Sequence, residues 1–268
     1  MSPFDEVGDR VFRRRYASLD LNIGVIMGEA GIAIVDTRAS HRQADELRAE
    51  LAQLTTSPIV AVINTHYHWD HVWGNARFPA VPIWGHVRCK EFLESDGNQM
   101  IDDALGWMPK EHHDEIRAVV TTPPTHVFEA VARLDLGDRE IWLSYHGRAH
   151  TDSDIVIRVP DAEVTFLGDL IEEGAPPQFG SSFPLDWPPT IQAIERNLAR
   201  TIVPGHGDVV DAAFVAAQRE ELAAVAAALA GHGAARDEAP AGPYPERFMR
   251  QAFNRYRELL RLQMERGL

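Results

Sequence analysis

The sequence of 268 residues predicts a mixed α/β (α+β) fold in which sheets are sandwiched between helices, with a C-terminal helical extension. Two observations lead to this fold class. The chain contains two strand-rich regions that are flanked by helical segments, and its composition turns helical from Asp211 onward. With 45% hydrophobic residues, a chain of this length can bury a large core without help from a partner.

The first strand-rich region begins with two apolar segments, at 21–27 and 32–35, that are rich in Ile and Val. The Gly28-Glu29-Ala30-Gly31 turn between them predicts a β-hairpin. Residues 41–54 then place apolar side chains at steps of three or four, with Ser40 as a helix cap, and therefore predict a helix. The continuous apolar run 59–63 predicts a central strand that is buried on both faces.

The second strand-rich region is separated from the first by a segment from about Glu91 to Pro124, which we expect to be irregular and to act as a lid. Further strands are predicted at 83–84, 134–143, 155–159, 164–167 and 202–203, separated by Gly-Asp, Gly-Arg and Pro-Asp turns. We expect residues 1–210 to form the main domain. We expect residues 211–268 to be helical and to pack on this domain or on a second subunit, so a homodimer is left open.

Composition excludes several functional classes. The formal charge of −14 makes nucleic acid a poor candidate for the partner, because an acidic surface repels phosphates. The single cysteine, Cys89, cannot form an internal disulfide. We expect it to be a small buried apolar residue of a helix. The N-terminus lacks the basic and apolar regions of a signal peptide, and no later segment resembles a membrane span. We therefore expect a cytoplasmic protein that acts on a small molecule and not at a membrane.

The chemistry of the chain is concentrated in the six-residue cluster His66-Tyr67-His68-Trp69-Asp70-His71, which directly follows the predicted central strand. His66 and His68 are two residues apart, so on an extended loop they point the same way and can bind one ion. Asp70 and His71 can face a second ion. A single histidine on a polar turn is usually solvated. In this cluster, however, the imidazoles would repel one another on protonation, so a bound cation is favoured. Imidazole and carboxylate are ligands that suit zinc.

Three more candidate ligands follow other predicted strands: His150 in GRAHTDSD, Asp169 in FLGDL and His206 in PGHG. With these residues, the pattern HxHxDH, then H, D and H, resembles the metallo-β-lactamase superfamily over about residues 20 to 210. The resemblance implies an αββα sandwich with a binuclear metal site at one edge. It also implies that His66, His68 and His150 hold a first zinc, that Asp70, His71 and His206 hold a second, and that Asp169 bridges the two. Asp36 matches a family position that supports the site from beneath.

Such a site implies a hydrolase. Two zinc ions, with iron or manganese as alternatives, lower the pKa of a shared water, and the resulting bridging hydroxide attacks an ester, thioester, lactone or related acyl bond. Asp70 would be the catalytic residue that orients this nucleophile. By the resemblance, Asp169 favours members similar to glyoxalase II and lactonases over true β-lactamases, which usually have Cys or Ser at this position.

Other functions remain open at this point. A phosphodiesterase, a persulfide dioxygenase with a single iron, and a zinc-stabilised scaffold without activity are the alternatives. Candidate pocket residues are Trp107, Met108, Phe179, Phe183 and Trp187, for which core packing is an equally good interpretation, and His146 as a donor to substrate. Six arginines lie near the C-terminus: Arg247, Arg250, Arg255, Arg257, Arg261 and Arg266. They resemble the glutathione-binding residues of glyoxalase II only in general. We prefer the interpretation that they form the solvent-facing side of an amphipathic helix.

Overall fold

The strands form two halves of a β-sandwich, described by a computed structural model over residues 2–265 and 267. The first half has the order β1 (Asp5–Gly8), β2 (Val11–Tyr16), β3 (Leu21–Gly28), β4 (Gly31–Val35), β5 (Ile59–Ile63), β6 (Ile83–His86) and β7 (His126–Phe128). The second half has the order β12 (Thr201–His206), β11 (Val164–Glu172), β10 (Ile155–Val159), β9 (Glu140–Tyr145) and β8 (Val131–Asp135). β3 and β12 join the two halves through the pair Leu21–His206.

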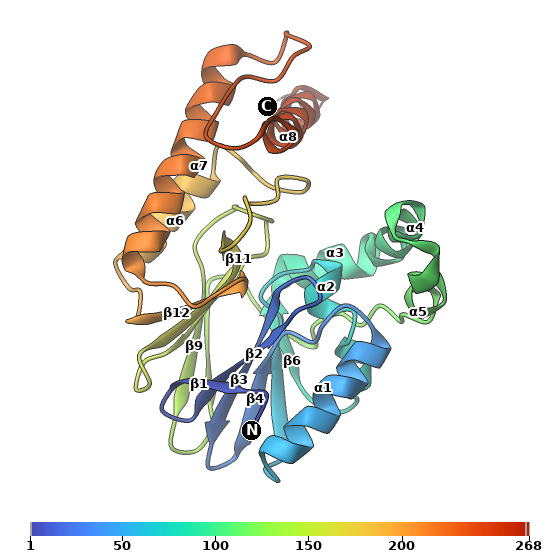
Figure 1. Ribbon diagram of the computed structural model, residues 1–268, viewed down its shortest axis with the longest axis vertical. Helices are drawn as coiled ribbons and strands as arrows, with labels where there is room; N and C mark the ends of the chain where they lie inside the picture. The colour runs from blue at the N-terminus through green and yellow to red at the C-terminus, as the bar shows by residue number, and fades with distance from the viewer. Residues whose placement is uncertain (1, 266, 268) are drawn as a thin grey trace.

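Helices cover the outer faces of this sandwich (Figure 1). On one side lie α1 (His41–Leu54), α2 (Trp69–Val72), α3 (Val87–Ser95), α4 (Gly97–Trp107) and α5 (His113–Arg117), with 3₁₀ turns at Asn75–Arg77 and Lys110–His112. On the other side lie α6 (Trp187–Glu195), α7 (Ala212–His232) and α8 (Glu246–Glu265). The layers are therefore helix, sheet, sheet and helix, as predicted.

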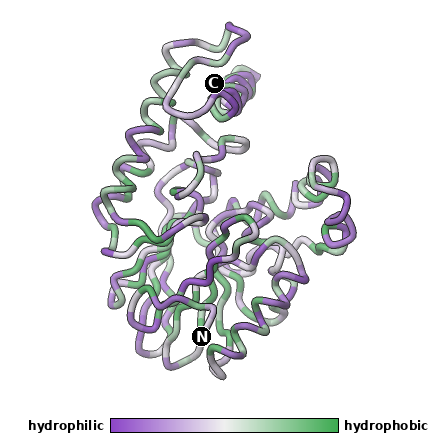
Figure 2. The backbone as a smooth tube through the Cα atoms, in the orientation of Figure 1, coloured by the Kyte–Doolittle hydropathy of each residue, from purple (hydrophilic) through white to green (hydrophobic). Residues whose placement is uncertain are grey.

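The core consists of layers because central strands such as β3, β4 and β11 are buried on both faces. On β4, Ala33 and Val35 face the second half of the sandwich, whereas Ile32 and Ile34 face α1, as the two-residue period of a strand requires. On the far side, the second half packs against α6, α7 and α8 through a separate apolar cluster. Figure 2 shows the resulting contrast between the apolar strands and α8, in which hydrophilic residues dominate.

Several predicted elements are confirmed closely. The β3–β4 hairpin and β5 lie where the sequence places them, and α1 spans the predicted residues with Ser40 capping the amide of Gln43 at 3.1 Å. The single strand predicted at 134–143 was wrong, because this segment is a hairpin made of the end of β8 and the beginning of β9.

Other predictions were wrong. The segment from Glu91 to Pro124 is largely helical and not irregular, because its short helices bury Leu93, Ala104 and Ile116 in one cluster with Trp73. β1, β2, β7 and α6 are further elements that were not predicted from the sequence. Pro188 and Pro189 lie at the start of α6, where a helix tolerates proline because its first amides have no partner within the helix.

Among the described residues, no helix has both the length and the apolar character needed to span a membrane.

Candidate metal centre

Four separate segments bring the seven predicted ligands to one edge of the sandwich. His66 and His68 lie on the loop after β5, and Asp70 and His71 lie on the short helix α2 that follows. His150 lies on the loop between β9 and β10, and His206 ends β12. Asp169 lies within β11, which is longer than the predicted 164–167, at a point where the pairing with β12 is irregular. All seven residues lie close together.

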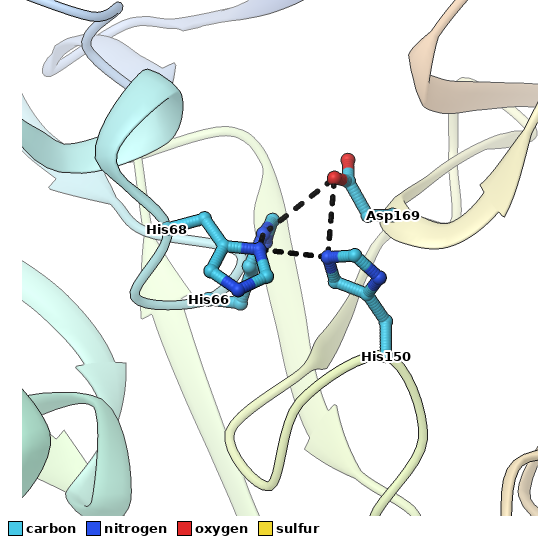
Figure 3. A group of neighbouring side chains, drawn as sticks. All are labelled: His66, His68, His150 and Asp169. Carbon is cyan, nitrogen blue, oxygen red and sulfur yellow. Dashed lines mark hydrogen bonds and ion pairs between the residues drawn. The ribbon is translucent and has the colours of Figure 1, made fainter. Parts of the chain in front are cut away.

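His66, His68, His150 and Asp169 form a first group, whose ligand atoms all lie within 4.8 Å of one another (Figure 3). Nδ1 of His68 lies 3.0 Å from Nε2 of His66 and 2.7 Å from Nε2 of His150. Oδ2 of Asp169 lies 3.3 Å from Nε2 of His150 and 3.7 Å from Nε2 of His66. Three ring nitrogens and one carboxylate oxygen therefore face a common point.

Asp70, His71 and His206 form a second group. Nε2 of His206 lies 3.4 Å from Oδ2 of Asp70, and Nε2 of His71 lies 3.7 Å from the same oxygen. Oδ1 of Asp169 lies 3.2 Å from Nε2 of His71 and 3.4 Å from Nε2 of His206. Asp169 thus directs Oδ2 to the first group and Oδ1 to the second.

The charges of the site favour a cation. Burial lowers the pKa of His68 to about 3 and that of His150 to about 4, so both imidazoles are neutral at pH 7 and available as ligands. Burial also acts on Asp169, but His206, His71 and His66 outweigh it and hold the pKa of this carboxyl well below its usual value. An ionised carboxylate is therefore buried between two sets of imidazoles. Burial acts against the protonated form of His71 and His206, but Asp169 and Asp70 outweigh it and hold the pKa of each imidazole well above its usual value. Without a metal ion, the negative charge of the site is therefore balanced by protons.

Residues outside these groups hold the rings in place. Asp36 is 1% exposed, and its carboxylate accepts hydrogen bonds from Nδ1 of His71, the amide of Thr65 and the Thr65 hydroxyl, each at 2.8 Å. His206 donates through Nδ1 to the carbonyl of Leu19 at 2.8 Å. These bonds leave Nε2 of His71 and Nε2 of His206 free to bind a metal ion. Asp36 has the supporting position that its sequence context predicts.

Two glycines shape the backbone around Asp169. Gly168 adopts a φ of 52°, which favours glycine, and it packs against the side chain of Thr65. A Cβ on Gly205 would lie 1.9 Å from Oδ1 of Asp169. The Asp169 carboxylate approaches the backbone of Gly205 so closely that only glycine fits at this position.

The residues present fit a bound metal. Nε2 of His71 and Oδ1 of Asp169 are buried and have no hydrogen-bond partner among the described residues, although they lie 3.2 Å apart. Buried polar atoms are rarely left without a partner unless an ion or water completes the site. The donor set of imidazole nitrogens and carboxylate oxygens is one that zinc, iron and manganese accept.

A cavity of about 1210 Å³ lies beside both groups. His68, Asp70, His150, Asp169 and His206 line it, and so do the apolar side chains Tyr67, Trp69, Phe92, Met100 and Trp107. Trp107 is 59% exposed, so its ring remains accessible to a ligand. A small molecule can therefore reach the ligand groups along an aromatic wall.

Not every predicted pocket residue reaches this cavity. Phe179 and Trp187 are fully buried in the core beneath α6, α7 and α8, so core packing is their role. His146 bonds Ser144 and lines a different surface pocket. The helix carrying the C-terminal arginines packs on the same chain through Phe248, Met249, Ala252 and Phe253. Arg266 lies outside the described residues, and Arg255 faces a loop of the site and not solvent.

Two supporting features of the site were not predicted from the sequence. Asn64 and Asn75 exchange side-chain hydrogen bonds of 3.1 and 2.8 Å beneath the loop that carries His66. Ser181 places its hydroxyl 2.6 Å from Nε2 of His68. The position of Asn64 directly after β5 could have suggested a structural role, but no pattern in the sequence marks Ser181.

This fold and this site define an αββα protein with two groups of side chains that can hold a metal ion. The family model of the metallo-β-lactamase superfamily matches residues 19–206, and the chain belongs to that superfamily. Curated relatives include the metallo-β-lactamase type 2 of Bacteroides fragilis, 23% identical over 69% of this chain and 68% of the relative. The enzyme of the same name from Bacillus cereus is 21% identical over 70% of this chain and 67% of the relative.

Solved structures agree on the fold. A metallo-β-lactamase from Pontibacter korlensis aligns with a TM-score of 0.65 and 16% identity, covering 82% of this chain and 98% of that one. The DIM-1 metallo-β-lactamase aligns with a TM-score of 0.63 and 18% identity over 82% of this chain. At such identities, these structures establish the αββα fold alone.

Proposed function

We propose that this protein is a hydrolase that uses two metal ions, expected to be zinc, to cleave an acyl bond of a small molecule: an ester, thioester, lactone or related bond. The position of Asp169 supports this proposal most directly. Its two carboxylate oxygens face separate ligand groups, next to a cavity that is large enough for a small molecule.

In this proposal, His66, His68 and His150 would hold the first ion, and Asp70, His71 and His206 would hold the second. The carboxylate of Asp169 would serve both groups. When bound, the ions would supply a water whose pKa is lowered toward neutrality and would polarise the substrate carbonyl. Asp70, which lines the cavity, orients the attacking water with its carboxylate.

The rest of the chain positions the substrate. Tyr67, Trp69 and Trp107 offer a surface for an apolar acyl group or leaving group. During hydrolysis, the water oxygen bonds to the carbonyl carbon, the bond to the leaving group breaks, and a proton passes to the leaving atom. The products are a carboxylic acid and an alcohol or thiol, or a hydroxy acid from a lactone.

The proposed substrate class is supported by Asp169 and not by the names of the relatives. The curated relatives are called β-lactamases, and a β-lactam amide is also an acyl bond. The presence of Asp169 at the shared ligand position favours esters, thioesters and lactones, as its resemblance to glyoxalase II and lactonases implies.

The test is hydrolysis of a thioester, a lactone, a phosphodiester and a chromogenic β-lactam by protein purified without added metal. We expect hydrolysis of at least one acyl substrate that stops on chelation and returns with zinc. The variant Asp70→Asn should lower kcat/KM by about 10²–10⁴-fold. The matched control Asp102→Asn, on the exposed side of α4, should leave kcat/KM unchanged.

Other outcomes would move the protein to another function. Cleavage of the phosphodiester alone would indicate a phosphodiesterase. Oxygen uptake with a persulfide, together with one bound iron, would indicate a dioxygenase. Bound zinc without hydrolysis of any acyl substrate would favour a scaffold and overturn the proposal.

A further inference from the structure

We propose that helix α8 of the C-terminal extension strengthens metal binding at the first group. The helix holds the loop between β11 and α6, and Ser181 on this loop fixes the ring of His68. This inference rests on the proposed metal site. It assigns a positioning role to Ser181 and Arg255, which belong to neither ligand group.

The geometry of His68 requires a particular tautomer. Its Nδ1 faces Nε2 of His66 at 3.0 Å and Nε2 of His150 at 2.7 Å, so Nδ1 is the atom that would bind metal. A neutral imidazole that offers a lone pair on Nδ1 carries its proton on Nε2. Ser181 Oγ lies 2.6 Å from Nε2 and can accept that proton in a hydrogen bond.

The supporting contact of His68 comes from a different part of the chain than those of His66 and His71. Thr65 lies beside Nδ1 of His66 at 3.0 Å, and Asp36 bonds Nδ1 of His71, so both of these contacts come from the first half of the sandwich. Ser181 instead lies on the loop between β11 and α6, 113 residues away from His68 in the sequence. The orientation of His68 therefore depends on where this loop is held.

Helix α8 holds the loop through its polar side chains. Arg255 donates from Nε to the carbonyl of Ser182 at 2.9 Å and from Nη2 to the carbonyl of Ser181 at 3.3 Å. Gln251, one turn earlier, accepts the amide of Phe179 at 2.8 Å. The Arg255 side chain is only 15% exposed, so these bonds are shielded from competing water.

The apolar face of α8 fixes the helix from which these two side chains extend. Phe248, Met249, Ala252 and Phe253 are buried, and the last three belong to the apolar cluster that also contains residues of α6 and α7. At the other end of the loop, the amide of Phe183 bonds the carbonyl of Ala149, directly before His150, at 2.8 Å. Contacts thus run without a break from α8 through the loop to His68.

A contact to the outer nitrogen of a metal-binding histidine commonly changes metal affinity by 10- to 100-fold. We therefore expect Ser181→Ala to weaken zinc binding at the first group by about 10- to 100-fold. Ser181→Thr keeps the hydroxyl and should restore most of the affinity. Arg255→Met removes both bonds to the loop carbonyls and should act in the same direction as Ser181→Ala.

The experiment measures zinc affinity by competition with a chromogenic chelator, and the tautomer of His68 by long-range ¹H–¹⁵N correlation NMR. Arg257→Met is the matched control, since Arg257 lies on the same helix with a side chain that is 43% exposed. The control should retain wild-type affinity. In the Ser181→Ala variant, we expect the His68 proton to distribute between Nδ1 and Nε2.

Unchanged affinity, within about twofold, and an unchanged tautomer in both Ser181→Ala and Arg255→Met would overturn the inference while leaving the proposed function intact. A wild-type protein that binds no metal would overturn both. If Arg255→Met does not fold, Ser181→Ala decides the question, because it removes a single hydroxyl from a half-buried loop residue.

Discussion

The support that Asp36 gives to the metal centre can be tested by replacing its carboxylate with an amide of the same shape. Asp36→Asn keeps the size of the side chain, and asparagine tolerates the φ of 65° at this position. Asp36 accepts three hydrogen bonds, each 2.8 Å long, at a site that is 1% exposed. An amide cannot accept all three, because its NH₂ group is itself a donor and opposes at least one of them.

The expected cost follows from those bonds. A buried donor that loses its acceptor costs about 1–3 kcal/mol, and more where a charge is involved. With one or two donors left without an acceptor, Asp36→Asn should lower the free energy of unfolding of the metal-free protein by about 2–5 kcal/mol. The variant should also weaken metal binding at the second group by about 10- to 100-fold, since the ring of His71 loses its partner.

Urea unfolding of the metal-free protein, with the slope m compared between variants, measures the first effect, and chelator competition measures the second. Asp102→Asn on the exposed side of α4 is the control and should stay within about 0.5 kcal/mol of the wild type. A loss below about 1 kcal/mol together with unchanged metal affinity would refute the supporting role of Asp36.

Three further predictions follow from particular contacts. Gly205→Ala should displace Asp169, because its Cβ would lie 1.9 Å from Oδ1, and elemental analysis should show less bound metal than in the wild type. Trp107→Ala should raise KM for an apolar substrate without changing the melting temperature, since the ring is 59% exposed beside the cavity; an unchanged KM would remove Trp107 from the binding surface. Partial burial raises the pKa of Glu50, but hydrogen bonds from Arg14 and Tyr16 outweigh it and hold this pKa below its usual value. The stabilisation from ionised Glu50 is complete above the unfolded-state pKa and is lost as the pH falls through the lower folded-state pKa. Glu50→Gln should therefore destabilise the protein at pH 7. The difference in urea midpoint between the wild type and this variant should narrow below about pH 4.3.

The parts of the fold that could be predicted are those whose signals are local. Helix α1 has a capping serine and a regular apolar period, and its predicted range matches the structure at both ends. Helix α4 places Met100, Ile101, Ala104 and Leu105 at helical steps, but it begins at Gly97 without a side-chain cap, and α5 has only five residues. Their helical form depends on burying Ala104 and Ile116 against Trp73, a contact that exists only after the chain has folded.

The same distinction applies to the site. The ligands could be proposed because histidines and aspartates at strand ends, with HxHxDH spacing, carry a chemical pattern. Asp169 was found although β11 continues beyond it to Glu172. Ser181 and Arg255 could not be found, because their roles depend on a loop and a helix that approach His68 from distant parts of the chain.

The metal content of protein purified without added metal tests the central claim most directly. Elemental mass spectrometry should find about two divalent ions per chain, zinc being expected, and about one in His206→Ala, which removes a ligand of the second group alone. Two ions in the wild type that fall to one in this variant would support a binuclear centre built from the two ligand groups. No bound metal, or a single ion that His206→Ala leaves in place, would contradict it.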